Sequence, residues 1–116
     1  MKMVHYTDID PVQFDNEAVK NIKGRVLIGK ADKAKNFCMR LFEIEKNGHT
    51  PFHAHEWEHE IFVHSGRGEA FCNNEWLPVS RGTALFIPGG EEHQIRNISE
   101  EPLIFLCLVP STAPEL

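Results

Sequence analysis

Turn-forming residues recur along this sequence at intervals so short that no long helix fits between them. They cluster at six places, which are 46–48, 65–68, 73–74, 80–82, 88–90 and 97–102. Around and between them lie short runs rich in Val, Ile, Phe and Leu, which are Arg25–Ile28, Phe37–Glu45, His59–His64, Gly68–Cys72, Thr83–Ile87, His93–Asn97 and Leu103–Val109. Residues 16–22 alone have a helical look, and that stretch is so short that we expect a turn there. Short strands at this spacing predict an all-β antiparallel sandwich or barrel.

The length of the chain allows one hydrophobic core. At 116 residues and 13.3 kDa the sequence matches a single domain, 1–116, since domains commonly have about 100 to 150 residues. Its 41% of hydrophobic and 25% of charged residues are typical of a globular chain that folds unaided. The net charge of −5 and the lack of a basic run argue against nucleic acid and anionic membranes as partners.

The cysteines indicate a reducing compartment. Cys38, Cys72 and Cys107 are odd in number and form no Cys-x-x-Cys pair, which fits neither a disulfide framework nor a zinc ribbon. No stretch approaches the roughly 20 apolar residues that span a bilayer, and Met1–Asp10 has no apolar signal segment. We therefore expect a soluble, cytoplasmic protein.

Side chains alternate between the two faces of a strand, so each run predicts which residues point inward. In the run that begins at His59, the residues His59, Ile61 and Val63 share one apolar face. His59 is therefore expected on the interior face of its strand. The last run, Leu103–Val109, is apolar on both faces, which predicts that a second sheet or another subunit covers its outer side.

Histidine is concentrated in one part of the chain. Five of the seven histidines lie between residues 49 and 64. His53 and His55 are one residue apart, a spacing that on a strand places both imidazoles on one face, about 6 to 7 Å apart along the backbone. Two such rings can share a metal ion, and His59 follows as a possible third ligand. The alternative is a solvated loop that is merely rich in histidine.

The residues around the histidines follow two spaced patterns. The first is Gly48-x4-His53-Ala54-His55-x3-His59-x6-Gly66. The second is Gly82-x5-Pro88-x-Gly90-x2-His93-x3-Asn97. These patterns, within residues 48–97, resemble the two defining motifs of the cupins. The first pattern has one residue fewer after its glycine and has His59 where that family usually has Glu.

A closer resemblance covers most of the chain. The stretch His53–Val63, together with Arg25–Gly29 and Phe105–Leu108, is similar to the small bacterial manganese cupins that bind metal through four histidines. This resemblance implies a double-stranded β-helix, or jelly-roll barrel, with the metal at its centre. It also implies a homodimer joined through sheet surfaces and N-terminal strands, here within residues 1–36. It implies no particular substrate.

The motifs make four histidines the expected ligands of one divalent ion, and these are His53, His55, His59 and His93. One of them could instead be a hydrogen-bonded core histidine, and Glu60 competes with His59 as a ligand. Strand alternation favours His59, because a ligand at Glu60 would turn Ile61 outward. Manganese follows from the resemblance alone, whereas imidazole also suits Fe, Zn, Ni or Cu.

Further residues are expected to line the pocket. Arg40 either enters it as a clamp for an anion or forms a structural ion pair on a sheet face. Cys107 has the position that lines the metal cavity in the resembling family, although a free cysteine is more often a small buried hydrophobe. Phe105 is expected to keep the cavity narrow and partly apolar. Asn97 is expected to cap a turn, and Trp57 to lie at a dimer interface or at the barrel rim.

These observations favour a metal-dependent enzyme that acts on a small molecule. It would either use oxygen, like a dioxygenase or another oxidoreductase, or polarise a small anionic substrate by Lewis-acid chemistry. Four neutral imidazoles leave the ion its full +2 charge, which favours anionic ligands. One alternative is a non-redox isomerase or lyase that acts on sugar acids. Another is a non-catalytic module that binds a metal or a metabolite.

Overall fold

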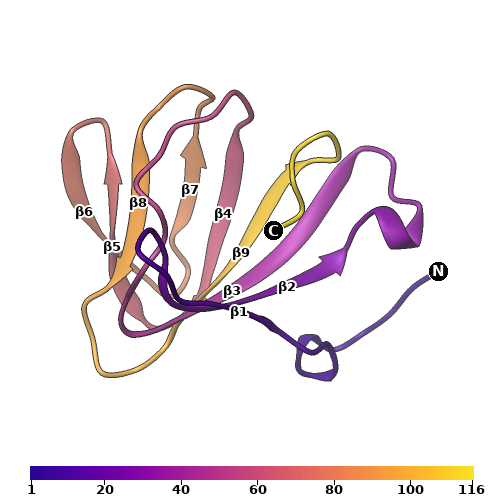
Figure 1. The fold of residues 1–116 in the computed structure, drawn as a ribbon, viewed down its shortest axis with the longest axis horizontal. Coiled ribbons are helices and arrows are strands. Elements are labelled where there is room, and N and C mark those ends of the chain that lie inside the picture. The colour runs from indigo at the N-terminus through magenta and orange to yellow at the C-terminus, as the bar shows by residue number, and fades with distance from the viewer.

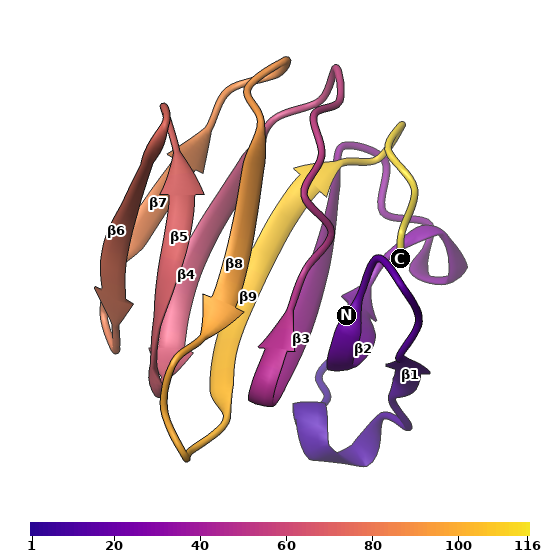
Figure 2. The same ribbon diagram turned by 60° about the vertical axis from the view of Figure 1, so that its left-hand side comes forward.

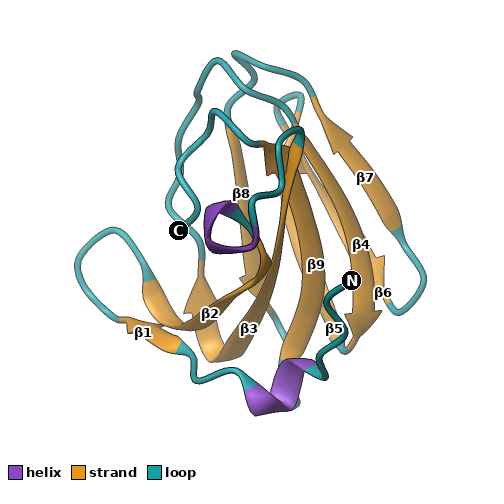
Figure 3. Ribbon diagram, turned by 90° about the vertical axis from the view of Figure 1, so that its right-hand side faces the viewer, coloured by secondary structure: helices purple, strands orange, loops and turns teal.

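Strands make up most of the molecule, as the spacing of turn residues predicts, and they form one antiparallel sheet that curls on itself (Figure 1). The computed structural model describes all 116 residues. The strands are β1 (Val12–Phe14), β2 (Lys20–Ile28), β3 (Phe37–His49), β4 (His59–Ser65), β5 (Arg67–Cys72), β6 (Glu75–Ser80), β7 (Ala84–Ile87), β8 (His93–Asn97) and β9 (Leu103–Pro110). Two single-turn 3-10 helices, Tyr6–Asp8 and Lys30–Asp32, complete the structure (Figure 3). No helix has the length and apolar character needed to cross a membrane.

The strand order is β6-β5-β8-β3-β9-β4-β7, and β2 and β1 continue the sheet from β3. The long strand β3 belongs to both layers, since Phe37–Ile44 pairs with β9 and His49 at its other end pairs with Arg96 of β8. Figure 2 shows the resulting layers, with β6, β5 and β8 in front of β7, β4 and β9. This arrangement confirms the predicted all-β, jelly-roll architecture.

The interior between the layers is apolar and follows the predicted alternation. On β4 the side chains of His59, Ile61 and Val63 are buried, and the residues between them are exposed. On β9 every second residue from Leu103 to Val109 is buried, with at most 3% of its surface exposed. Glu60 is exposed and points outward, so the expectation that His59 and not Glu60 faces the interior is confirmed.

All seven predicted strands are present, but two strands were not predicted. β1 is only three residues long, and β6 contains Pro78 and several polar residues, which weaken a strand pattern. The turn before β6 carried a clear signal, since Asn73 and Asn74 both have positive φ, 54° and 62°, as in a two-residue hairpin turn. An Asn-Asn pair after a strand therefore indicates that a second strand follows.

The predicted turns at 46–48 and 16–22 differ most from the observed structure. The expected turn at 46–48 is a bulge inside β3, where Asn47 has a φ of 64° and the strand continues to His49. The strand continues because His49 pairs with Lys20 on one side and Arg96 on the other. The expected turn at 16–22 ends early, since β2 begins at Lys20. The longer β3 leads directly into the histidine segment.

Candidate metal centre

Two loops at the same end of the barrel carry the first and second motifs. His53 and His93 form an isolated pair in which each backbone N–H donates to the carbonyl of the other, at 3.2 and 2.9 Å. The N–H of Gly90 donates to the carbonyl of His55 at 2.7 Å. Gly89 lies so close to the backbone of Glu56 that a Cβ atom at this position would overlap its carbonyl oxygen. These backbone contacts hold the two motifs together, and the side chains of Thr50 and Gln94 add further hydrogen bonds between the same segments.

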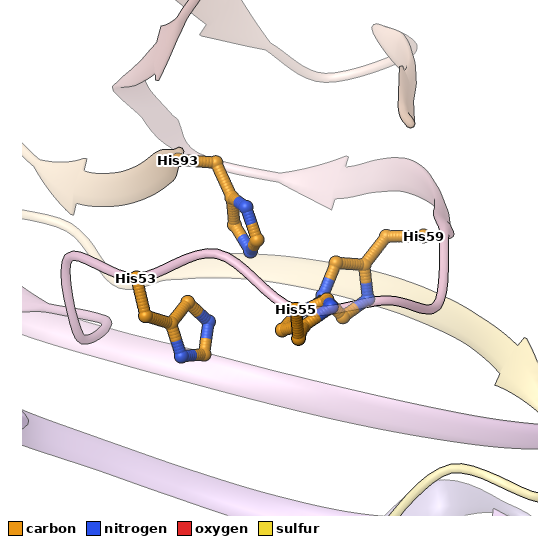
Figure 4. A group of neighbouring side chains, drawn as sticks. All are labelled: His53, His55, His59 and His93. Atoms are coloured by element: carbon orange, nitrogen blue, oxygen red, sulfur yellow. The ribbon is translucent and has the colours of Figure 1, made fainter. Parts of the chain in front are cut away.

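This pairing brings the four expected histidines into one cluster (Figure 4). His53 and His55 extend from the loop after β3, His59 from the start of β4, and His93 from the start of β8. One ring nitrogen from each lies within 4.8 Å of the others. The Nε2 atoms of His55 and His59 are 2.8 Å apart. All four residues predicted from the motifs are thus in one place.

Backbone carbonyls orient two of the rings. The Nδ1 of His55 is 2.8 Å from the carbonyl of Trp57, and the Nδ1 of His93 is 2.9 Å from the carbonyl of Glu91. A carbonyl can only accept, so both Nδ1 atoms carry the proton and both Nε2 atoms present a lone pair. Trp57 also stacks on His55, with ring centroids 4.1 Å apart and planes 8° from parallel. Trp57 therefore lies directly beside the histidine cluster.

The cluster has the dimensions and the charge state that a metal ion requires. Ligand atoms bound to one ion at about 2.0 to 2.3 Å lie about 3 to 4.5 Å from one another, close to the observed spread. The Nε2 of His93 is buried and has no hydrogen-bond partner, as expected of an atom that faces a ligand.

Desolvation favours the neutral form of His53, His59 and His93, which is the form that binds metals. It lowers the pKa of His53 to about 4 and, with a further contribution from the positive charge of Arg40, the pKa of His59 to about 3. Burial also lowers the pKa of His93. Three of the four rings therefore resist protonation near neutral pH.

A cavity of about 190 Å³ adjoins the cluster. The three residues predicted for its wall, Arg40, Phe105 and Cys107, all line it. The rest of its lining is mostly apolar and consists of Phe14, Val19, Ile22, Phe42, Thr50, Pro51, Ile61, Ile95 and Leu116, with His53, His59 and His93 at the metal end. No Asp or Glu side chain lines this wall, and Arg40 is the one charged side chain in it.

Arg40 points into the barrel and is 7% exposed, which excludes the alternative of an ion pair on a sheet face. Its Nη2 donates to Cys107 Sγ at 3.0 Å, and its Nη1 donates to the carbonyl of Glu115 at 3.4 Å. Its Nε is buried without a partner, and no ion pair of the structure includes this guanidinium. Burial raises the pKa of the Cys107 thiol, and Arg40 opposes this effect.

Other residues of the site could not be assigned from the sequence. Gly89 and Leu116 carry no motif signal, and their roles depend on contacts with distant segments. The stacking of Trp57 on His55 could have been suspected from their spacing of two residues. Asn97 does what was expected, since its side chain donates to the carbonyls of Ile44 and Glu101 and so closes a turn.

The jelly-roll barrel and a histidine cluster at one end of it define a class of proteins, and the chain belongs to that class, the cupins. The family described as "Cupin domain" matches residues 40–109, more than half of the chain. The resemblance seen in the two motifs is thereby confirmed.

Among solved structures, the polyketide cyclase RemF from Streptomyces resistomycificus superposes with a TM-score of 0.91. It is 36% identical, and the match covers 98% of this chain and 82% of that one. The oxalate-binding protein of Thermotoga maritima is 27% identical over 113 residues, which is 92% of each chain.

Two further relatives are longer proteins. The 1-methylthio-D-xylulose 5-phosphate methylsulfurylase of Rhodospirillum rubrum is 34% identical over 71 residues, 61% of this chain and 46% of the relative. The glucose-6-phosphate isomerase of Pyrococcus horikoshii is 27% identical over 113 residues, 90% of this chain and 58% of the relative. The chain therefore spans about half the length of these two relatives.

The lowered pKa values predict how the metal-free protein responds to pH. A histidine whose pKa falls from 6.5 to about 3 on folding binds fewer protons folded than unfolded, so its contribution to stability is complete above pH 6.5 and is lost as the pH falls toward 3. In chelator-treated protein, the urea midpoint followed by circular dichroism should fall between about pH 7.5 and pH 5. His59→Gln should reduce this fall, and the exposed His64→Gln should leave it unchanged. Equal pH dependence in wild type and His59→Gln would contradict the prediction.

Proposed function

We propose that this chain is a metal-dependent enzyme that acts on a small anionic molecule. One divalent ion would be held by His53, His55, His59 and His93. The observation that carries the proposal is the combination of four converging imidazoles with Arg40, a buried guanidinium that no carboxylate neutralises. A buried charge without a counter-ion is costly, so its presence beside a cavity favours a ligand of opposite charge.

The charge of the site supports an anionic substrate. Neutral imidazoles do not offset the +2 of a bound ion, and no acidic residue lines the cavity. A metal ion, when bound, would supply Lewis-acid polarisation of a substrate oxygen, or activation of dioxygen if the ion is redox-active. More specifically, we propose an oxidoreductase of the dioxygenase type.

The other residues of the pocket would orient the substrate and exclude water. Arg40 can offer its unpartnered Nε–H and a neighbouring N–H to one carboxylate as a fork. Phe105 and Ile61 contribute apolar surface to the cavity wall. The cavity, at about 190 Å³, is smaller than the roughly 300 to 1,000 Å³ of pockets for drug-sized ligands. A dicarboxylate or a 2-oxo acid suits this size and charge.

The relatives support the chemistry without naming the reaction. The Thermotoga maritima protein is described as oxalate-binding, and oxalate is a dicarboxylate. A non-redox isomerase or lyase is the second candidate, because four of the relatives are glucose-6-phosphate isomerases. Manganese is the proposed ion, since this is what the four-histidine resemblance implies; Fe, Zn, Ni and Cu also suit imidazole.

Metal content tests the site directly. Protein purified without added metal should contain close to one divalent ion per chain by elemental mass spectrometry. The double variant His53→Ala, His93→Ala should lose most of it, because half of the ligand set is removed. His64→Ala, at an exposed histidine outside the cluster, is the control. Undiminished metal in the double variant would disprove the site, and zinc in place of manganese would favour the non-redox candidate.

Arg40 should contribute to binding of the anion more than to binding of the metal. In metal-loaded protein, Arg40→Ala should weaken the affinity for oxalate by about ten- to hundredfold, because a charged hydrogen bond contributes about 1.5 to 3 kcal/mol. Isothermal titration calorimetry measures this, with Arg96→Ala on the outer surface as the control. Unchanged oxalate affinity would exclude Arg40 as a clamp. No binding of oxalate or of a 2-oxo acid by the wild type would count against an anionic substrate.

We also propose that the protein is a homodimer. The outer face of β4, β7 and β9 carries Phe62 and Phe86, which are 51% and 58% exposed, beside Leu106 and Leu108. β7 is at the free edge of the sheet, where a second copy can continue or cover it. The N-terminal segment 1–36 is the other part of the interface expected from the resemblance.

Light scattering tests this proposal. At low micromolar concentration the mass should be near twice 13.3 kDa. The double variant Phe62→Asp, Phe86→Asp should shift the mass toward that of a monomer, because two charges would be buried in an apolar contact. Ile98→Asp, also exposed but outside this face, should not shift it. A wild-type monomer would refute the dimer.

A further inference from the structure

Three buried groups meet behind the His59 ring, on the side away from the other histidines. The Nδ1 of His59 is 3.2 Å from Cys107 Sγ and 3.4 Å from Arg40 Nη2. Arg40 Nη2 is itself 3.0 Å from the same sulfur. All three residues are at most 8% exposed, so water does not replace these contacts. The partners of His59 thus differ from those of His55 and His93, which face backbone carbonyls.

The two neighbours of His59 would favour opposite tautomers of its ring. An imidazole that binds an ion through Nε2 must carry its proton on Nδ1, and this proton needs an acceptor. A guanidinium has no lone pair to accept with, so the sulfur of Cys107 is the one acceptor among these groups. If Arg40 donated to Nδ1 instead, the proton would be on Nε2, which points at His55. That tautomer cannot bind the ion.

We propose that Cys107 is a positioning residue of the metal centre, because its sulfur accepts the Nδ1–H of His59 and keeps the Nε2 lone pair directed at the ion. Arg40 Nη2 is in contact with both this sulfur and the ring Nδ1, and an N–H that it directs at the sulfur is not available to the ring. Histidine ligands usually donate to a carboxylate, a carbonyl or water, so a thiol in this place is an uncommon partner. The inference rests on the proposed metal site.

Zinc affinity, measured by competition with a chromophoric chelator, tests the role of the sulfur. Cys107→Val keeps the approximate volume but removes the acceptor, and it should weaken zinc binding by about 10- to 100-fold, as loss of such partners does. Cys107→Ser keeps an acceptor and should bind zinc close to wild type. If Cys107→Val does not fold, Cys107→Ala replaces it. Wild-type affinity in the variant without an acceptor would overturn the inference.

The competition with Arg40 gives a second, sharper test. In the Cys107→Val background, Arg40→Met should restore part of the zinc affinity, because it removes the donor that favours the wrong tautomer. The gain should exceed the effect of Arg40→Met alone, so the two changes should not be additive. A merely structural role of Cys107 predicts no recovery of zinc affinity in the double variant, and the lack of recovery would overturn the inference.

Nuclear magnetic resonance of the histidine nitrogens reports the tautomer itself. Zinc-loaded wild type should have the His59 proton on Nδ1, and zinc-free Cys107→Val should have it on Nε2. The same tautomer in both would overturn the inference. Failure of the wild type to bind one zinc per chain would refute the proposed metal site, and this result is distinct from tight zinc binding that does not depend on Cys107.

Discussion

The two reciprocal backbone hydrogen bonds between His53 and His93 are the constraint on which the site depends. They join loops whose histidines are 40 residues apart in the sequence, and they do so without using any side chain. The imidazoles therefore remain free to bind something else. The bond from Gly90 to the His55 carbonyl and the close approach of Gly89 to Glu56 fix the same contact at neighbouring points. Precise placement of four ligands follows from backbone pairing at the end of the barrel.

The apolar barrel interior contains the buried imidazoles of His59 and His93 and the guanidinium of Arg40, while His55 is half-buried and His53 is exposed. Polar atoms that are shielded from water must be satisfied internally. Carbonyls of the chain do this for His55 and His93, and a thiol is in the corresponding place for His59. Two buried nitrogens remain without a partner, His93 Nε2 and Arg40 Nε. One belongs to the proposed metal ligands and the other to the proposed anion clamp. In the proposed site, the Nε2 of His93 would bind the metal cation and the Nε–H of Arg40 would donate to the bound anion.

Much of this structure follows from local patterns in the sequence. Strand alternation places His59 inside and Glu60 outside, and motif spacing selects all four members of the cluster. What could not be predicted depends on contacts between distant segments. The inward direction of Arg40 is decided by its pairing opposite Cys107 on β9, and Leu116 reaches the pocket only because the last residues fold back over it. β6 was not predicted because Pro78 is unfavourable in a strand, although the Asn-Asn turn before it indicated a hairpin.

The strand order also bears on how the site is assembled during synthesis. β9 follows every other strand in the sequence, yet in the sheet it lies between β3 and β4. Until it emerges from the ribosome, β4 lacks this neighbour and His59 lacks the sulfur behind it. Such non-local pairing also folds slowly. A metal ion at the proposed site would therefore meet the complete site only after β9 has paired with β3 and β4, and the ions available at that stage of folding would influence which one is bound.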